Sequence, residues 1–136
     1  LASSAASDVY KRQLYDTVDV DDEQRDFLKN SVGTVEIPKD QSAYYFGVEN
    51  LDFEEAVASE PLINAIAFSV CLMRVKDGTD IDELKAEIRR SANPAKWICV
   101  DVNPNDVRVE SVGDLVLLIM ADDSEKYSEA FYALAE

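Results

Sequence analysis

One apolar segment constrains the fold of this chain more than any other feature. Residues 66–76 hold an almost unbroken run of apolar side chains and show no alternation between apolar and polar positions. A strand with one face in solvent alternates, whereas a strand buried on both faces is apolar throughout. The run therefore predicts a buried strand, and Asp77-Gly78 ends it because both residue types favour turns.

The rest of the second half predicts a helix, three more strands and a final helix. Asp80 and Glu83 have the spacing of a capping box, so a helix is expected from there to about residue 92. We expect strands over residues 96–102, 107–112 and 115–121. A glycine–aspartate turn joins the last two strands as a hairpin, and an amphipathic helix follows.

The first half of the chain is less regular. An acidic start predicts a helix over residues 21–30, because negative charge stabilises a helix N-terminus. A short strand is expected over residues 34–37. Asn50 or Asp52 is expected to cap a helix that runs to about Ser59, since Asp52 and Glu55 again have capping-box spacing.

These elements predict an α+β protein, built as a two-layer sandwich with helices on one face of a mainly antiparallel sheet. The strand order stays open. The core is expected to centre on Val70, Leu72, Leu84, Ile88, Val100, Leu117, Ile119 and Phe131.

The first residues carry a separate signal. Residues 3–13 match, in order, one translated frame of the mosaic-end adapter used in transposase-based DNA library preparation, as in a conceptual translation from a metagenomic assembly. We expect residues 1–13 to be a non-native leader that the fold does not need, and residues 14–136 to form a single globular domain. On this interpretation the native N-terminus, where an export signal would lie, is not part of the sequence.

Charge and residue usage exclude several function classes. The chain has 28 acidic and 13 basic residues and a net charge of −15, so it repels nucleic acid and anionic lipid surfaces. It has no histidine, which removes histidine-based nucleophilic catalysis and histidine metal ligation. Two cysteines do not make a structural zinc site, and we expect Cys71 and Cys99 to be buried, reduced thiols.

The acidic clusters do not predict a metal or catalytic site. Asp19, Asp21 and Glu23 alternate as at the start of a calcium-binding loop, but Gln24 replaces its glycine and Asn30 its final glutamate. The other acidic clusters coincide with expected helix starts, where carboxylates act as caps. The sequence therefore predicts no catalytic residue, no metal ligand and no cofactor.

Aromatic residues supply the candidate ligand-binding positions. Tyr44 and Tyr45 lie in a segment without a clear pattern, and Trp97 lies near the start of an expected strand. Aromatic side chains in loops form ligand platforms, although packing in the core is their commoner role. If the domain has a ligand pocket, we expect Tyr44, Tyr45 and Trp97 to line it.

Turn, cap and strand motifs over about residues 45–136 are similar to those of one known family. They are Gly47-Val48-Glu49-Asn50 through Glu55, Pro61-Leu62-Ile63-Asn64-Ala65, the strand that ends at Gly78, and the later Gly113-Asp114 with the final helix. The chain resembles a family of small lipoproteins of unknown function from Gram-positive, often gut-dwelling, anaerobes. The resemblance implies an extracytoplasmic protein anchored to the membrane by a lipidated cysteine that lies outside this sequence. It implies no activity.

Three functional hypotheses follow. The first is a non-catalytic, envelope-associated interaction module that meets an unknown protein or small ligand at the cell surface. Such a module contacts no nucleic acid, and contacts the membrane only through its lipid anchor. The alternatives are a carboxylate-based or divalent-cation-dependent enzyme and a cytoplasmic binding module.

Overall fold

The computed structural model describes residues 13–63, 66–97 and 100–134. The strands are β1 (Val32–Glu36), β2 (Glu55–Pro61), β3 (Ser69–Arg74), β4 (Val107–Val112) and β5 (Leu115–Met120). The helices are α2 (Asp22–Asn30), α3 (Ser42–Phe46), α4 (Ile81–Ser91) and α5 (Ser124–Leu134), with short 3-10 turns η1 (Lys39–Gln41) and η2 (Pro104–Asp106). Residues 13–17 are also helical.

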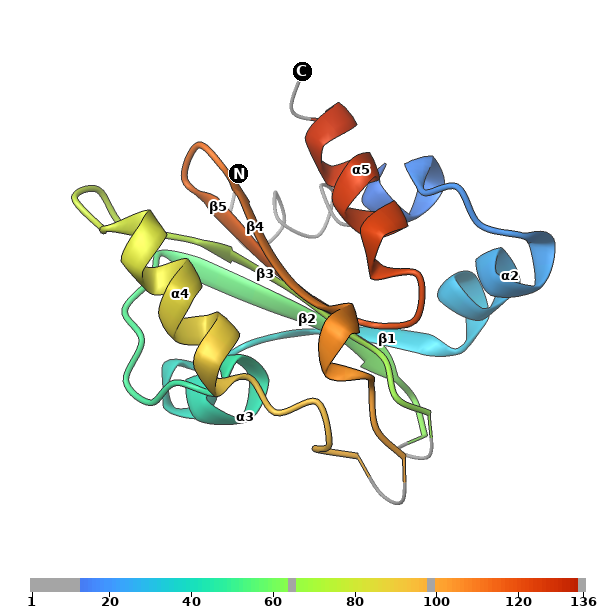
Figure 1. The fold of residues 1–136 in the computed structure, drawn as a ribbon, viewed down its shortest axis with the longest axis horizontal. Helices are drawn as coiled ribbons and strands as arrows, with labels where there is room; N and C mark the ends of the chain where they lie inside the picture. Colours follow the sequence, from blue (N-terminus) through green and yellow to red (C-terminus); the bar gives the residue numbers. More distant parts are fainter. Residues whose placement is uncertain (1–12, 64–65, 98–99, 135–136) are drawn as a thin grey trace.

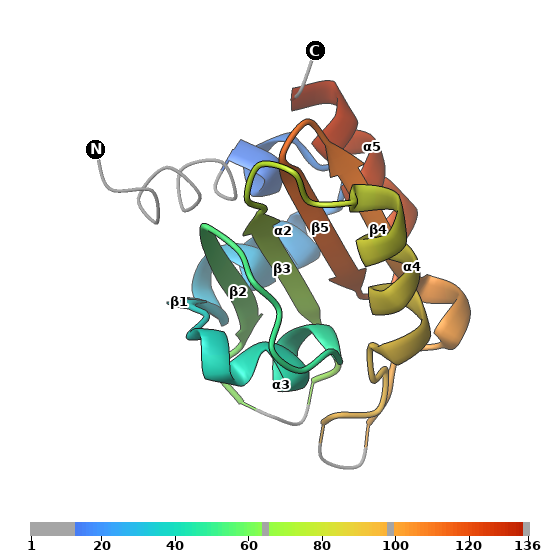
Figure 2. The same cartoon turned by 90° about the vertical axis from the view of Figure 1, so that its left-hand side faces the viewer.

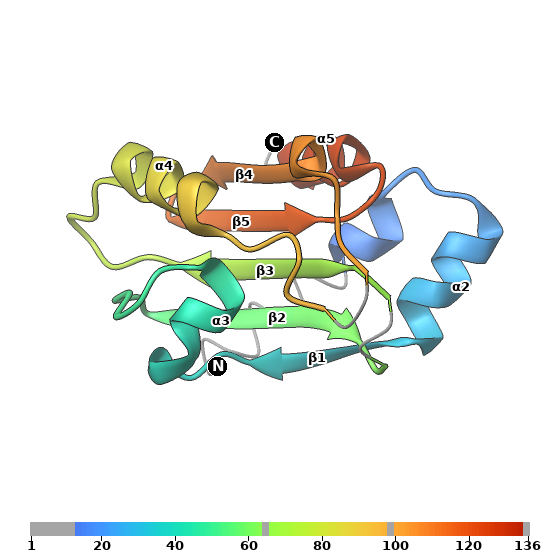
Figure 3. The same ribbon diagram turned by 60° about the horizontal axis from the view of Figure 1, so that its bottom comes forward.

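The strands form one antiparallel sheet in the order β1-β2-β3-β5-β4. Figure 3 shows this order from bottom to top. Helices pack against this sheet, so the predicted α+β class is confirmed (Figure 1). The hairpin of β4 and β5 also forms as predicted. Asp21 and Asp80 cap α2 and α4 by accepting hydrogen bonds from the backbone N–H groups of Gln24 (2.8 Å) and Glu83 (3.2 Å).

Helices cover both faces of the sheet, which corrects the expected two-layer arrangement with helices on one face. Figure 2 shows α3 and α4 in front of the sheet and α2 and α5 behind it. Met73 and Leu118 belong to the core cluster under α3 and α4, whereas Leu72 and Leu117 belong to the cluster under α2 and α5. The physical reason is that β3 and β5 are apolar on both faces, and each apolar face has to be covered.

Residues 55–61 form strand β2, so the helix expected to begin at Asn50 or Asp52 and to run to Ser59 is wrong. This segment pairs with β1 on one side and with β3 on the other. Asp52 caps no helix and instead forms ion pairs with Lys39 (3.0 Å) and Lys76 (2.8 Å). Strand pairing and burial outweigh a local capping signal because they satisfy the backbone groups of the whole segment.

The strand expected over residues 96–102 is also absent from the part of that range that the structure describes, namely 96–97 and 100–102. The segment folds back on itself, and the backbone N–H of Val102 donates a hydrogen bond to the carbonyl of Pro94 (2.8 Å). Trp97 and Val102 are buried against the core cluster under α3 and α4. The segment is apolar because it covers the sheet, whose edge beside β5 is taken by β4.

The predicted core residues divide between the two clusters. Six are buried: Val70, Leu72, Ile88, Leu117, Ile119 and Phe131. Leu84 and Val100 are partly buried and pack against the cluster under α3 and α4. The expectations for residues 1–12 and for Cys99 fall outside the described residues. Among the residues that are described, no helix has the length and apolar character needed to cross a membrane.

Candidate functional site

The three aromatic residues that the sequence singled out come together around one lysine, Lys96. Tyr44 and Tyr45 lie on α3, and Trp97 is the neighbour of Lys96 in the chain. The Nζ atom of Lys96 lies 4.5 Å from the ring centroid of Tyr44, 5.1 Å from that of Tyr45 and 5.5 Å from that of Trp97. All three distances are within the range of cation–π attraction.

A carboxylate and a hydroxyl complete the surroundings of Lys96. Its side chain is 4% exposed and forms an ion pair with Glu60 of β2. Ser69 of β3 donates a hydrogen bond to the same carboxylate (2.7 Å), and its Oγ atom lies 3.5 Å from Nζ. A buried ammonium needs such compensation because it has lost its hydration. We call Tyr44, Tyr45, Trp97, Glu60 and Ser69 the Lys96 cage.

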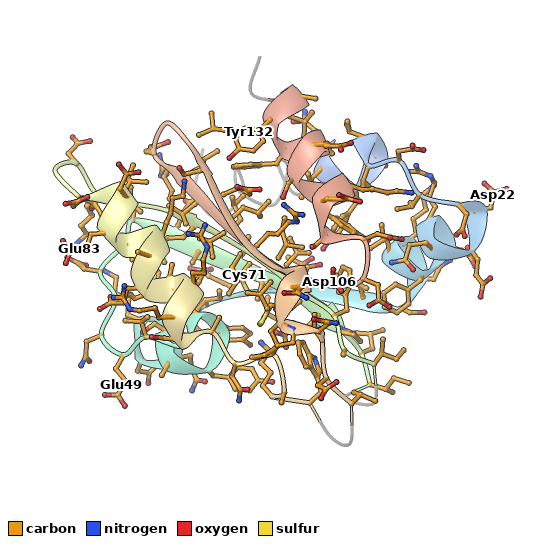
Figure 4. All side chains as sticks on the ribbon, in the orientation of Figure 1. Asp22, Glu49, Cys71, Glu83, Asp106 and Tyr132 are labelled. Atoms are coloured by element: carbon orange, nitrogen blue, oxygen red, sulfur yellow. The ribbon has the colours of Figure 1, made fainter. Side chains whose placement is uncertain are left out.

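The Lys96 cage is built for holding a cation rather than for acyl transfer. A serine beside a lysine can act as a nucleophile with its base. Here Ser69 is fully buried, and its hydroxyl donates to Glu60. Burial and the Glu60 charge raise the pKa of Tyr45, so this phenol stays protonated at neutral pH. Cys71 lies next to the cage, because its Sγ atom is 3.4 Å from Oγ of Ser69. Cys71 is buried, as predicted, and Figure 4 shows it among the core side chains.

A second site, which sequence analysis missed, is an open groove of about 480 Å³ on the opposite face of the sheet. It lies between the start of α2, the start of α5 and residues 66–68. Three aromatic residues line its floor: Phe27 is partly exposed, whereas Phe68 and Tyr127 are buried beneath the surface. Phe68 contacts Phe27 edge-to-face, with ring centroids 5.5 Å apart, and Tyr127 at 6.0 Å.

The rim of the groove is acidic. Asp21 and Glu23 come from the start of α2, and Asp122 and Asp123 precede α5; all four are exposed. Lys126 contributes a positive charge. The sequence predicts that both acidic groups start helices, and Asp21 does cap α2. Their convergence depends on two helices from opposite ends of the chain, so no local motif reveals it.

One polar group lies in the floor of the groove. The hydroxyl of Tyr127 accepts a hydrogen bond from Nε2 of Gln24 (3.1 Å). Burial raises the pKa of Tyr127, and the nearby Asp123 carboxylate acts in the same direction against the opposing effect of the Gln24 hydrogen bond. The phenol therefore stays neutral at physiological pH, and the buried Tyr127 ring supports the base of the groove.

The acidic rim is not arranged as a metal centre. Within residues 13–63, 66–97 and 100–134, no three side chains of the metal-ligating types converge on a common point. The four carboxylates surround the groove instead. This arrangement suits a cationic ligand, since four carboxylates line one groove.

Comparisons of this chain with protein-family models, with curated proteins and with solved structures gave no match. The lipoprotein resemblance is therefore neither supported nor contradicted by them.

Proposed function

We propose that this protein is a non-catalytic interaction module that binds a cationic partner in the groove between α2 and α5. The observation that carries the proposal is the combination of an acidic rim with an aromatic floor. Carboxylates attract lysine and arginine side chains and repel anions. The partly exposed ring of Phe27 can pack against the alkyl stems of the same side chains and attract their cationic heads. The volume of the groove is typical of ligand sites, which span about 300–1,000 Å³.

The charge of the whole chain supports a cationic partner. A net charge of −15 produces a field that draws cations towards the surface and orients them before contact. The groove concentrates this field, because four carboxylates line a concave surface with an apolar floor. We expect the association to weaken as salt is added, since added ions screen exposed charges.

The polar groups of the groove favour binding over catalysis. Tyr127 stays protonated, and its oxygen is engaged by Gln24. Asp21 already accepts the hydrogen bond that caps α2. These groups can donate, accept and attract, but their arrangement offers no activated nucleophile paired with a base.

We place the module outside the cytoplasm, anchored to the membrane, on the strength of its resemblance to small lipoproteins. The partner would then be a cationic protein or small ligand at the cell surface. The complete natural gene tests this part. A lipidation motif with its cysteine upstream of the position of Leu14 would support it. A complete gene without an export signal would contradict it and would favour a cytoplasmic binding module, with groove binding unchanged.

The groove is tested by neutralising Asp122 and Asp123. We expect the double substitution Asp122→Asn with Asp123→Asn to weaken binding of a short peptide of alternating lysine and leucine roughly tenfold, because each lost ion pair contributes up to about 1 kcal/mol. Asparagine suits position 123, where φ is +59°. Isothermal titration calorimetry gives the dissociation constants.

The matched control removes the same charge elsewhere. Asp82→Asn with Glu83→Gln neutralises two exposed carboxylates on α4, and Figure 4 shows Glu83 at the periphery far from α5. We expect this variant to bind the peptide nearly as well as the unmodified protein. Equal weakening by both pairs would show that net charge alone attracts the peptide. Tight binding of Ca²⁺ or Mg²⁺ in the same calorimeter would instead favour a cation-dependent enzyme.

A further inference from the structure

The Lys96 cage has the composition of a site that binds an ammonium ion. Three aromatic rings surround Nζ at 4.5–5.5 Å, and the Glu60 carboxylate neutralises its charge. Aromatic cages of this kind recognise cationic ligands in many proteins. Here the cation belongs to the same chain.

The polar contacts specify the chemical class of the cation. Nζ contacts the carboxylate of Glu60 and lies 3.5 Å from Oγ of Ser69, and both contacts use N–H donors. A primary ammonium has three such donors, whereas a quaternary ammonium has none. The cage therefore suits a primary alkylammonium better than a quaternary one.

The parts of the cage differ in how they are held. Tyr44 and Tyr45 belong to helix α3, while Glu60 and Ser69 belong to the paired strands β2 and β3. Lys96 lies in the irregular segment between α4 and η2. Most residues of the cage are therefore held by a helix or by paired strands. The cation itself belongs to a segment without regular secondary structure.

Trp97 provides independent evidence that the cage is more than ordinary core packing. Its indole N–H is buried and has no hydrogen-bond partner among the described residues. Buried polar groups are nearly always paired, and exceptions often mark functional sites.

We propose that the Lys96 cage is a binding site for primary alkylammonium groups, which Lys96 fills as a tethered ligand. An external amine enters when Lys96 withdraws. This site is separate from the groove, because Phe68 and Tyr127 belong to the core cluster on the other face of the sheet.

The test removes the Lys96 side chain from the cage and adds a primary alkylammonium ion in its place. Trp97 is the only tryptophan of the chain, so tryptophan fluorescence reports on the cage directly. In Lys96→Ala, we expect n-butylammonium to change this fluorescence saturably, and n-butanol at the same concentrations to have no such effect. Tetramethylammonium should bind more weakly. For the unmodified protein, the midpoint of the fluorescence change should lie at an n-butylammonium concentration at least about tenfold higher, because the tethered Lys96 competes at high effective concentration.

Each outcome decides for or against the proposal. If Lys96→Ala is unfolded without amine, n-butylammonium should refold it, because a ligand that binds only the folded state stabilises it. Circular dichroism measures this refolding. Absence of both saturation and refolding overturns the proposal. The proposal is also overturned if the fluorescence change has the same midpoint concentration of n-butylammonium in the variant and in the unmodified protein, since the amine then binds outside the cage. Lys29→Ala, which removes an exposed lysine on α2, is the control and should behave as the unmodified protein.

Discussion

Replacing Leu117 by alanine is expected to lower the free energy of unfolding by about 2–5 kcal/mol. Leu117 is fully buried in β5 and lies opposite Leu72 of β3. Its side chain belongs to the core cluster under α2 and α5, where a truncated side chain leaves a cavity that surrounding strands cannot close. Urea denaturation followed by circular dichroism measures the change.

The control for Leu117 is Leu62→Ala. Leu62 follows the end of β2 and is 69% exposed. We expect its truncation to change the free energy of unfolding by less than about 0.5 kcal/mol, as at most surface positions. Similar losses at both positions would mean that Leu117 is not the core residue that the structure shows.

Replacing Gly47 by alanine is expected to destabilise the protein by more than about 2 kcal/mol, because it combines backbone strain with a steric clash. Gly47 ends α3 with φ +80°. A Cβ atom there would lie 2.1 Å from the carbonyl oxygen of Ser91 and 2.6 Å from the backbone nitrogen of Ala92. Backbone atoms of the α4 terminus cannot move aside as a flexible side chain can.

Gly78→Ala separates the two effects. Gly78 has φ +86°, but a Cβ atom there meets nothing within 4 Å. We expect Gly78→Ala to lower the free energy of unfolding by about 1–2 kcal/mol, because only the strain of the left-handed backbone is added. Thermal and urea denaturation of both variants give the difference. Equal losses would show that the close approach of Gly47 to Ser91 contributes nothing.

The contact at Gly47 also bears on the Lys96 cage. Gly47 directly follows the helix that carries Tyr44 and Tyr45, and Ser91 is the last residue of the helix that leads into the segment of Lys96. The close backbone approach thus holds two walls of the cage near the residue that fills it. We expect Gly47→Ala to alter Trp97 fluorescence in the folded state, whereas Gly78→Ala should not.

Local sequence motifs correctly predicted those helices and strands whose formation depends mainly on neighbouring residues. The pair Asp80 and Glu83 and the pair Asp52 and Glu55 have identical spacing, yet only the first begins a helix. The difference is tertiary, because residues 55–61 are needed between β1 and β3 to complete the sheet. The apolar run at residues 66–76 correctly indicated a strand buried on both faces, which itself requires helices on both sides.

The candidate sites were predictable only in part. Residue type alone picked out Tyr44, Tyr45 and Trp97, and the structure brings them together. It did not pick out Lys96 or Glu60, because their pairing depends on how β2 and the segment after α4 lie in space. The groove escaped prediction for the same reason, since its acidic rim is assembled from both ends of the chain.

Chemical-shift mapping tests the proposed groove most directly. The alternating lysine–leucine peptide is titrated into ¹⁵N-labelled protein, and the shifts of the backbone amides are followed. We predict that the largest changes fall at the start of α2, at residues 66–68 and at residues 121–127, and that they shrink as salt is added. A matched peptide with glutamate in place of lysine should cause none of them. Changes concentrated on the face covered by α3 and α4, or no saturable change at all, would contradict the proposal that this groove binds a cationic partner.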